Sequence, residues 1–203
     1  MFTSNQLIYI LFSIPGIIIA TTLHEFVRAA VSTYFGDTLP KQKGRLTLNP
    51  IKHFEPIGFI LMLSTGFGWG KPVDTSSLYY KNRKRDTLLT AILPTIANLI
   101  FAILISIIVF LLMNYAQNYI LNILTLIVYY NISIAVYNIV PVSPMDGLKV
   151  LSNIMPSNQY FKLMQYEKII QILFLLLLFM GLGDFIFSPI INFIYFIISR
   201  IYM

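Results

Sequence analysis

The sequence predicts an all-α polytopic membrane protein, and three observations support this fold class. Of its 203 residues 57% are apolar and 11% are charged, whereas a soluble domain usually carries about 25% charged residues. Several apolar stretches reach the ~20 residues that a helix needs to cross a bilayer. The basic residues gather in a few connections between these stretches. One membrane-embedded domain, residues 1–203, is the organisation that this length favours.

About five transmembrane helices are predicted. The first runs from Gln6 to Phe35 and carries His24, Glu25 and Arg28 in its C-terminal half. The other four are Leu88–Met113, Tyr119–Val140, Ile169–Leu182 and Phe185–Ile201. A short apolar piece, Ile57–Gly66, would reach only ~15 Å as a helix. It cannot cross a bilayer, so we expect a re-entrant segment between the first and second spans.

The charged residues predict how these helices are oriented. Basic residues occupy the connections 36–56, 67–86 and 141–168, while the first six residues and the connection 114–118 carry none. If the re-entrant segment dips in and returns, all three basic connections share one face. The positive-inside rule makes that face cytoplasmic. We therefore expect a multi-pass protein of the cell membrane with its N-terminus outside and its C-terminus, including Arg200, in the cytoplasm.

Composition also excludes several classes of function. The chain has no cysteine, so it forms no disulfide, thiolate metal site or cysteine nucleophile. Its net charge of +6 is explained by membrane orientation and attraction to anionic lipid headgroups, and not by nucleic-acid binding. No internal repeat of the kind that marks a small transporter is present. The N-terminal sequence MFTSNQ has no basic residue, so no cleavable signal peptide is expected.

The sequence HEFVR in the first span is one residue away from the zinc-binding motif H-E-x-x-H. Ionisable residues inside a span are costly and are candidates for function by default. His24 and Arg28 are four residues apart and therefore share one helix face. A structural alternative is that Arg28 extends to the inner membrane interface while His24 bonds a neighbouring helix.

A second polar motif, NIVPVSPMDGLKV, follows the third span. Pro141 and Pro144 stop the helix, and Gly147 permits a turn that other residues could not make. This places Asp146 at the cytoplasmic end of its span, at roughly the depth of His24. A histidine and an aspartate at one depth make a partial zinc site. Alternatively, Asp146 is the N-cap of the following helix.

With these motifs the sequence resembles the site-2 proteases, or peptidase family M50, which are intramembrane zinc metalloproteases. The form it resembles is a small one without PDZ or CBS domains. The motif N-x-x-P-x-x-P-x-D-G is complete from Asn138 to Gly147. Two further stretches, GRLTLNP (Gly44–Pro50) with its following His53, and FGWGKPV (Phe67–Val73), are similar to stretches of that family.

The resemblance implies a zinc-dependent peptidase that cleaves transmembrane-helix substrates. His24 and Asp146 would be zinc ligands, and Glu25 would accept a proton as the zinc-bound water attacks a peptide carbonyl. The substrate would be a membrane helix that unwinds locally. Asn98 would bind its extended backbone, although Leu93 stands where the related motif G-P-x-x-x-N has glycine.

Arg28 stands where that family has its second zinc-binding histidine, and arginine offers only donors. Three outcomes are open. Arg28 pairs with Asp146 and Glu25 in a catalytically inactive pseudoprotease that binds membrane helices as a scaffold or regulator. Alternatively, His53 supplies the missing ligand while Arg28 turns to the interface. Finally, a single base change from a histidine codon would make the arginine a sequence variant.

Overall fold

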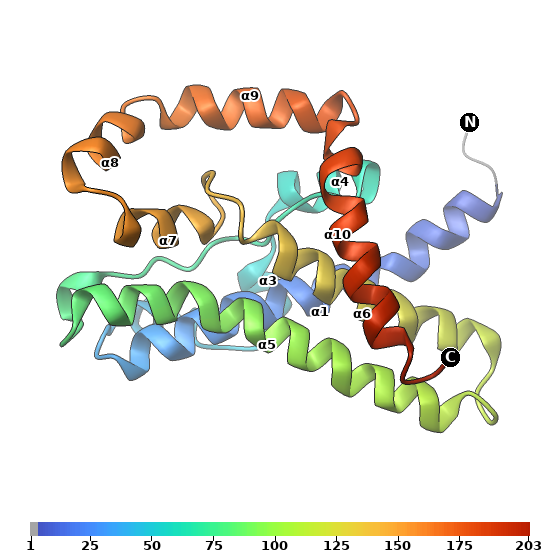
Figure 1. Ribbon diagram of the computed structural model, residues 1–203. Coiled ribbons are helices and arrows are strands. Elements are labelled where there is room, and N and C mark those ends of the chain that lie inside the picture. Colours follow the sequence, from blue (N-terminus) through green and yellow to red (C-terminus); the bar gives the residue numbers. More distant parts are fainter. Residues whose placement is uncertain (1–3) are drawn as a thin grey trace.

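The computed structural model describes residues 4–203, and each regular element in that range is a helix (Figure 1). Four helices are long and apolar enough to cross a membrane, namely α1 (Ser4–Tyr34), α5 (Arg83–Leu112), α6 (Asn118–Tyr137) and α10 (Leu182–Ser199). The shorter elements are α2 (Leu39–Gln42), α3 (Pro50–His53), α4 (Pro56–Thr65), η1 (Ser77–Tyr79), α7 (Gly147–Ile154), α8 (Ser157–Met164) and α9 (Glu167–Phe179). The predicted all-α polytopic fold is confirmed.

The centre of the protein is a three-helix bundle of α1, α5 and α6, which pack against one another. Helices in a membrane associate where small residues let their backbones approach closely. Ala20 of α1 and Ala102 of α5 are fully buried in this core. At Gly16 a Cβ atom would lie 2.9 Å from the carbonyl oxygen of Leu126. Glycine at that position therefore lets α1 and α6 meet at backbone distance.

Helix α4 and the extended residues after it form a hairpin that enters the bundle and returns. Gly66 ends α4 in the left-handed conformation, with φ +73°, which glycine adopts readily. The chain then runs back along α4 until the amide of Lys71 donates to the carbonyl of His53 at 2.8 Å. At Gly58 a Cβ atom would lie 2.1 Å from the carbonyl oxygen of Trp69. The predicted short apolar segment that does not cross is thus confirmed.

The structure describes four helices that are long enough to span, where about five were predicted, because Ile169–Leu182 does not form a helix of that length. The residues fold as α9, a helix of 13 residues that reaches only ~20 Å at 1.5 Å per residue. It ends at Phe179, and Gly181 with φ +81° begins the turn into α10. In Figure 1, α9 stands apart from the three-helix bundle and joins it through α10.

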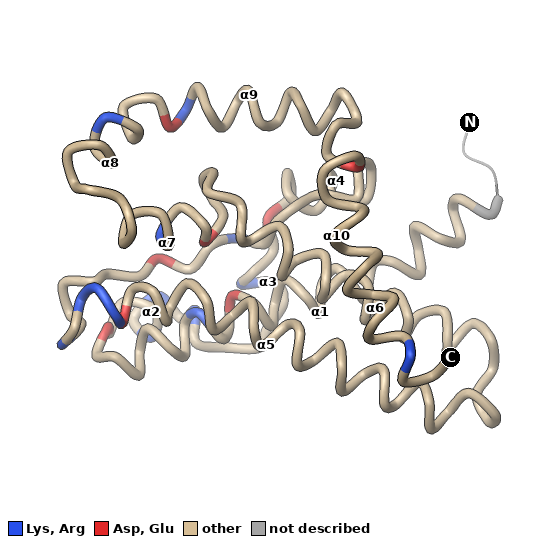
Figure 2. The backbone as a smooth tube through the Cα atoms, viewed as in Figure 1, with Lys and Arg blue, Asp and Glu red and all other residues tan. Residues whose placement is uncertain are grey.

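The cytoplasmic C-terminus stays a prediction, because four spans would place both ends of the chain on one side of the membrane and five spans would place them on opposite sides. The ring of Tyr195 lies 6.0 Å from that of Tyr129, and the ring of Phe187 lies 5.5 Å from that of Tyr137. Helix α10 is therefore antiparallel to α6, and Arg200 lies toward the end of the bundle where α6 begins. Figure 2 shows most of the other basic residues in the half of the molecule away from the C-terminus, around α2, α7 and α8. The N-terminal residues 1–3 lie outside the described range.

Candidate functional site: a buried ion-pair cluster

The polar residues singled out in the sequence come together inside the bundle. His24, Glu25 and Arg28 lie on α1, Asn98 lies on α5, and Asp146 lies in the turn between α6 and α7. Each of these residues is at most 3% exposed. Buried charges are stable only when they are paired and hydrogen-bonded, so the contacts among these five side chains determine what the site can do.

Arg28 bridges two carboxylates at the middle of the cluster. Its Nη1 donates to Glu25 Oε2 at 3.0 Å, and its Nη2 donates to Asp146 Oδ2 at 2.6 Å. Its Nε has no hydrogen-bond partner among the described residues. The side chain is 1% exposed, so it does not extend to the membrane interface. Arg28 thus makes the pairings with Asp146 and Glu25 that the first of the three outcomes predicted.

Both ring nitrogens of His24 face an acceptor oxygen, and a neutral imidazole, which has one N–H, donates to one of the two. Its Nε2 lies 3.0 Å from Asp146 Oδ2, and its Nδ1 lies 3.0 Å from Asn98 Oδ1. The amide nitrogen of Asn98 donates to the carbonyl of Ala20 and to Asn131 Oδ1, so its oxygen is the atom that faces the imidazole. The structure places Asn98 fully buried with its amide oxygen beside the imidazole of His24, and the contact between Asn98 and a substrate that the resemblance implied stays a prediction.

Asp146 is presented by the turn that the sequence NIVPVSPMDG forms. The amide of Gly147 donates to the carbonyl of Asn138 at 2.7 Å. A Cβ atom at residue 147 would lie 2.1 Å from the carbonyl oxygen of Ile139, so only glycine closes this turn. Asp146 occupies the N-cap position of α7, yet its carboxylate makes no capping bond. The side chain serves the ion-pair cluster instead of the helix.

The charges around Asp146 keep it ionised. Burial alone would raise the pKa of its carboxyl group, but the charges of Arg28 and Lys149 and the hydrogen bond with His24 outweigh that effect and hold the pKa below its usual range. Lys149 Nζ lies 3.3 Å from Asp146 Oδ1. Two carboxylates, Glu25 and Asp146, thus face two cations, Arg28 and Lys149, and the formal charges of these four side chains balance when His24 is neutral.

Glu25 is also bound to the strand that returns from the re-entrant hairpin. Its Oε2 accepts a hydrogen bond from the amide of Val73 at 2.7 Å. Arg45 fixes the same strand, because its guanidinium donates to the carbonyl oxygens of Lys71 and Pro72 at 2.6 Å and 3.3 Å. The GRLTLNP stretch therefore positions the strand that meets Glu25.

His53 does not join the cluster. Its Nε2 lies 2.7 Å from the carbonyl oxygen of Thr47, and its buried Nδ1 has no partner among the described residues. Burial of the imidazole lowers the pKa of His53. The structure thus places His53 at the start of the re-entrant hairpin, as predicted, without bringing its ring to His24 or Asp146.

In this arrangement the residues do not form a zinc site. A catalytic zinc needs three protein ligands and an open position for water. Within residues 4–203 no group of three His, Cys, Asp or Glu side chains could hold a metal ion. The guanidinium of Arg28 lies between the two carboxylates and remains charged at all relevant pH values.

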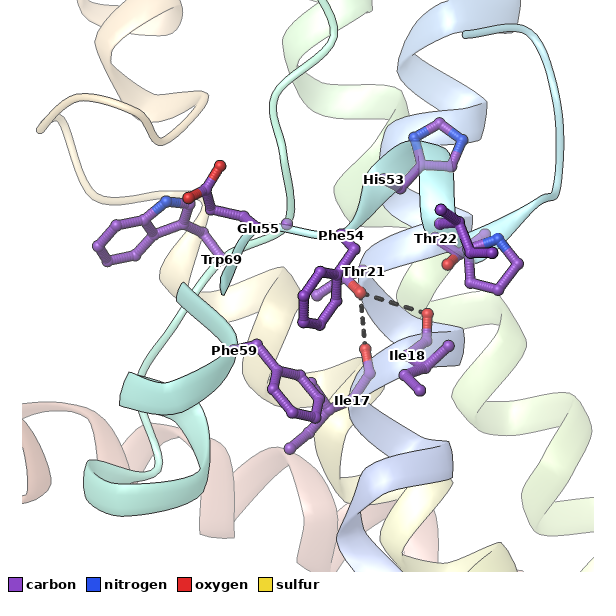
Figure 3. Close-up of a pocket in the computed structure, with 12 residues that line it drawn as sticks. Ile17, Ile18, Thr21, Thr22, His53, Phe54, Glu55, Phe59 and Trp69 are labelled. Atoms are coloured by element: carbon purple, nitrogen blue, oxygen red, sulfur yellow. Dashed lines mark hydrogen bonds between the residues drawn. The ribbon is translucent and has the colours of Figure 1, made fainter. Parts of the chain in front are cut away.

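A pocket of about 130 Å³ lies beside the cluster, between α1 and the re-entrant hairpin. Figure 3 shows Ile17, Thr21, Phe59 and Trp69 around it. At Gly70, which also lines it, a Cβ atom would lie 3.0 Å from Thr21 Cβ and 3.5 Å from Glu25 Cγ. A second apolar pocket of about 360 Å³ lies along the same part of α1, next to Phe101 of α5. Apolar recesses therefore reach the depth of Glu25.

Three residues of the site were not identified from the sequence. Asn131 is a polar residue inside a predicted span, which is the signal that could have identified it. In the structure its side chain is fully buried and its Oδ1 accepts a hydrogen bond from Asn98. Lys149 lies three residues after Asp146 on the same helix, a spacing that indicates contact. Nothing in the sequence signals that the amide of Val73 binds Glu25, because backbone donors carry no residue-type signature.

Comparison with known proteins gives two relatives. The chain is 32% identical over 183 residues to "Putative zinc metalloprotease YwhC" of Bacillus subtilis (strain 168). The aligned residues cover 87% of this chain and 84% of that protein. It is 25% identical over 143 residues to "Putative zinc metalloprotease Rip2" of Mycolicibacterium smegmatis, covering 68% of this chain and 55% of that protein. No protein-family profile and no solved structure matches the chain.

Proposed function

The chain belongs to the site-2 protease-like family of zinc metalloproteases, and we propose that it is an inactive member that binds transmembrane segments without hydrolysing them. The observation that carries this proposal is the position of Arg28. Its guanidinium occupies the space between Glu25 and Asp146, where a metal would have to meet the carboxylate ligand and the base.

Charge supports the loss of zinc. At an effective dielectric constant of 20, two unit charges 4 Å apart repel by about 4 kcal/mol, and a divalent ion beside a guanidinium by about twice that. Moving Arg28 away to admit a metal is also unfavourable, because it takes the guanidinium from its buried pairs with Glu25 and Asp146 and leaves their charges uncompensated. The cluster of Glu25, Asp146, Arg28 and Lys149 is already neutral without a metal, so Arg28 replaces zinc as the group that ties α1 to the turn before α7.

The pockets support binding of a membrane segment. They are lined mainly by apolar side chains from α1, the re-entrant hairpin and α5. Beside them, residues 67–76 form no helix and run as an open segment from α4 toward α5 (Figure 1). A transmembrane segment that unwinds locally would find both apolar recesses for its side chains and an open segment beside which to lie.

The expected partners are therefore transmembrane proteins within the bilayer. We propose that this bilayer is the cell membrane and that the basic connections face the cytoplasm.

A second candidate is zinc-dependent peptide hydrolysis after Arg28 is displaced. The observation that favours it is that Glu25, His24 and Asp146 keep a compact arrangement, with His24 and Asp146 only 3.0 Å apart. If Arg28 moved aside, His24 and Asp146 would be free to bind a metal near Glu25. A ligand in addition to these two would still be required.

Photocrosslinking in reconstituted vesicles separates binding from hydrolysis. A benzoylphenylalanine replaces Phe59 in the pocket or, as a control, Phe110 on the exposed face of α5. The probe is a synthetic 20-residue apolar peptide with a central Asn-Pro pair that favours unwinding. We expect crosslinks from position 59 well above those from position 110, with the peptide intact by mass spectrometry. Equal crosslinking at both positions would contradict helix binding, and peptide fragments that disappear in Glu25→Gln would establish the hydrolytic candidate.

A further inference from the structure

A polar pocket on the basic side of the protein has no role in the function proposed above. It has a volume of about 170 Å³ and is lined by Thr75, Ser77, Tyr80, Thr87, Thr90 and Lys149. Five of these six residues carry a hydroxyl group and the sixth is a cation. Pockets for drug-sized ligands usually measure about 300–1,000 Å³, so this one suits a small polar group and not a nucleotide.

Three of the hydroxyl groups are free to bind a ligand. Those of Tyr80 and Thr90 are engaged, since Tyr80 pairs with Ser32 and Thr90 donates to the carbonyl of Asp86. The hydroxyls of Thr75, Ser77 and Thr87 make no hydrogen bond to any described residue. These three residues come from the returning strand, from η1 and from the start of α5, so the fold brings their donors together around one space.

Lys149 is the cation among the residues that line this pocket, and the stretch of sequence from Thr75 to Thr90 is rich in basic residues. Between Thr75 and Thr90 the chain carries four basic residues, Lys81, Arg83, Lys84 and Arg85, and one acid, Asp86. Asp86 is buried and already paired with Arg85 at 2.9 Å. Asp74, just before the pocket, pairs with Lys43 at 2.8 Å. Asp37 also lies beside the pocket, where its Oδ2 accepts hydrogen bonds from the amide of Ser76 at 2.8 Å and from the hydroxyl of Ser32 at 2.7 Å. Each of these carboxylates thus has partners of its own, and the ammonium of Lys149 is the lining group that attracts an anion.

Lys149 links the pocket to the ion-pair cluster. Its side chain lines the pocket and is 33% exposed, while its Nζ lies 3.3 Å from Asp146 Oδ1. Asp146 retains Arg28 and His24 as partners if Lys149 turns away. The ammonium group can therefore face a ligand without leaving the carboxylate unpaired.

We propose that this pocket binds a phosphate group, held by the ammonium of Lys149 and the hydroxyls of Thr75, Ser77 and Thr87. A tetrahedral anion accepts hydrogen bonds from several directions, which matches three free hydroxyls and one cation, and charge-assisted bonds of this kind are strong. The group is either a free phosphate or the headgroup of an anionic lipid, since the pocket lies at the cytoplasmic end of the helices in the proposed orientation.

Thermal unfolding of the detergent-purified protein tests the free anion. Inorganic phosphate is titrated at constant ionic strength against chloride, and the rise in Tm gives the affinity. Loss of a charged partner should weaken binding about tenfold or more in Lys149→Met, and loss of one neutral partner should weaken it a few-fold in Thr87→Val. Lys162→Met, which removes the same charge from an exposed position on α8, should leave the affinity within about twofold.

Asp146→Asn controls for variants that merely fold poorly. Because this change releases Lys149 from its carboxylate partner, we expect tighter phosphate binding, whereas a general folding defect would weaken it. Opposite effects of Lys149→Met and Asp146→Asn therefore support a shared ammonium.

Native mass spectrometry tests the lipid source. Protein in mixed micelles of phosphatidylglycerol and phosphatidylcholine should retain phosphatidylglycerol, with fewer adducts in Lys149→Met and Thr87→Val than in Lys162→Met. Lipid adducts that depend on Lys149, without a phosphate-dependent Tm, identify a headgroup site, and the reverse identifies a free anion. If neither probe binds, or if Lys149→Met and Lys162→Met weaken binding equally, the proposal is overturned.

Discussion

Arg28 has the largest side chain among the fully buried residues that the structure describes. An arginine in the middle of a membrane helix is costly unless partners neutralise it, and here Glu25 and Asp146 do so at 3.0 Å and 2.6 Å. The contacts run from α1 to the turn before α7, which are separated by more than 100 residues in the sequence. At this position one side chain therefore decides both the stability of the bundle and the chemistry of the site.

Replacing Arg28 should destabilise the protein strongly. Arg28→Met leaves two carboxylates buried with less positive charge, and breaking a buried pair in this way costs about 3–5 kcal/mol. The measurement is the free energy of unfolding in a detergent–denaturant titration. Lys43→Met is the matched control, because its ion pair with Asp74 is exposed and should contribute less than about 1 kcal/mol. Equal losses in the two variants would show that Arg28 is not a structural centre.

The members of this cluster other than Lys149 could be predicted from the sequence, but their pairing could not. Ionisable residues in a span mark His24, Glu25 and Arg28, and the Pro-Gly pattern marks Asp146. The sequence was nevertheless compatible with more than one arrangement of the Arg28 side chain, because residue type does not say which carboxylate a guanidinium will reach. The amide bond from Val73 to Glu25 depends on the path of the hairpin, and no residue pattern encodes it.

At the scale of elements, the re-entrant hairpin depends on two glycines. A Cβ atom at Gly58 would lie 2.1 Å from Trp69 O, and one at Gly68 would lie 2.0 Å from Gly58 O. The returning strand lies against α4 only because neither residue has a side chain. Since this strand carries the amide of Val73 to Glu25, the glycines position a part of the site that they do not touch.

Gly58→Ala should push the returning strand away from α4. The chain has one tryptophan, Trp69, so its fluorescence reports on this strand directly. We expect a red-shifted emission and stronger quenching by acrylamide, with a loss of stability of about 1–3 kcal/mol from overpacking. Ser64→Ala, an exposed position on the same helix, should leave both the spectrum and the stability unchanged. A normal spectrum in Gly58→Ala would contradict the close packing of the hairpin.

The elements also show where sequence reading failed. The three helices of the central bundle were predicted to within a few residues, because long apolar runs specify a span. The run Ile169–Leu182 has the same composition but is shorter, and composition alone does not separate a short span from a helix that packs on a neighbour. In the structure this run forms α9, which ends before the turn at Gly181 and packs against α10.

At the scale of the whole molecule, four spans would place the two ends of the chain on the same side of the membrane. The basic connections then lie on the opposite face, with Arg200 as the exception outside the spans (Figure 2). This charge asymmetry still satisfies the positive-inside rule, which counts the bias and does not require every charge to comply.

Single cysteines can test this topology, because the natural chain has none. Tyr115→Cys and Met203→Cys lie at strongly exposed positions and should both react with an impermeant maleimide on intact cells. Lys81→Cys should react only after lysis. Labelling of Met203→Cys only after lysis would restore five spans, while labelling of Lys81→Cys on intact cells would reverse the proposed orientation.

The central claim is that Arg28 stands in place of zinc, and the most direct measurement is the zinc content per chain. Elemental mass spectrometry is performed on the detergent-purified wild type and on Arg28→His, with Arg28→His/His24→Ala as the control for adventitious metal. The wild type is predicted to hold no more zinc than the control, while Arg28→His, which supplies a third ligand, is predicted to hold about one zinc per chain. A wild type that holds about one zinc, lost on His24→Ala, would contradict the claim and point to a working metal site.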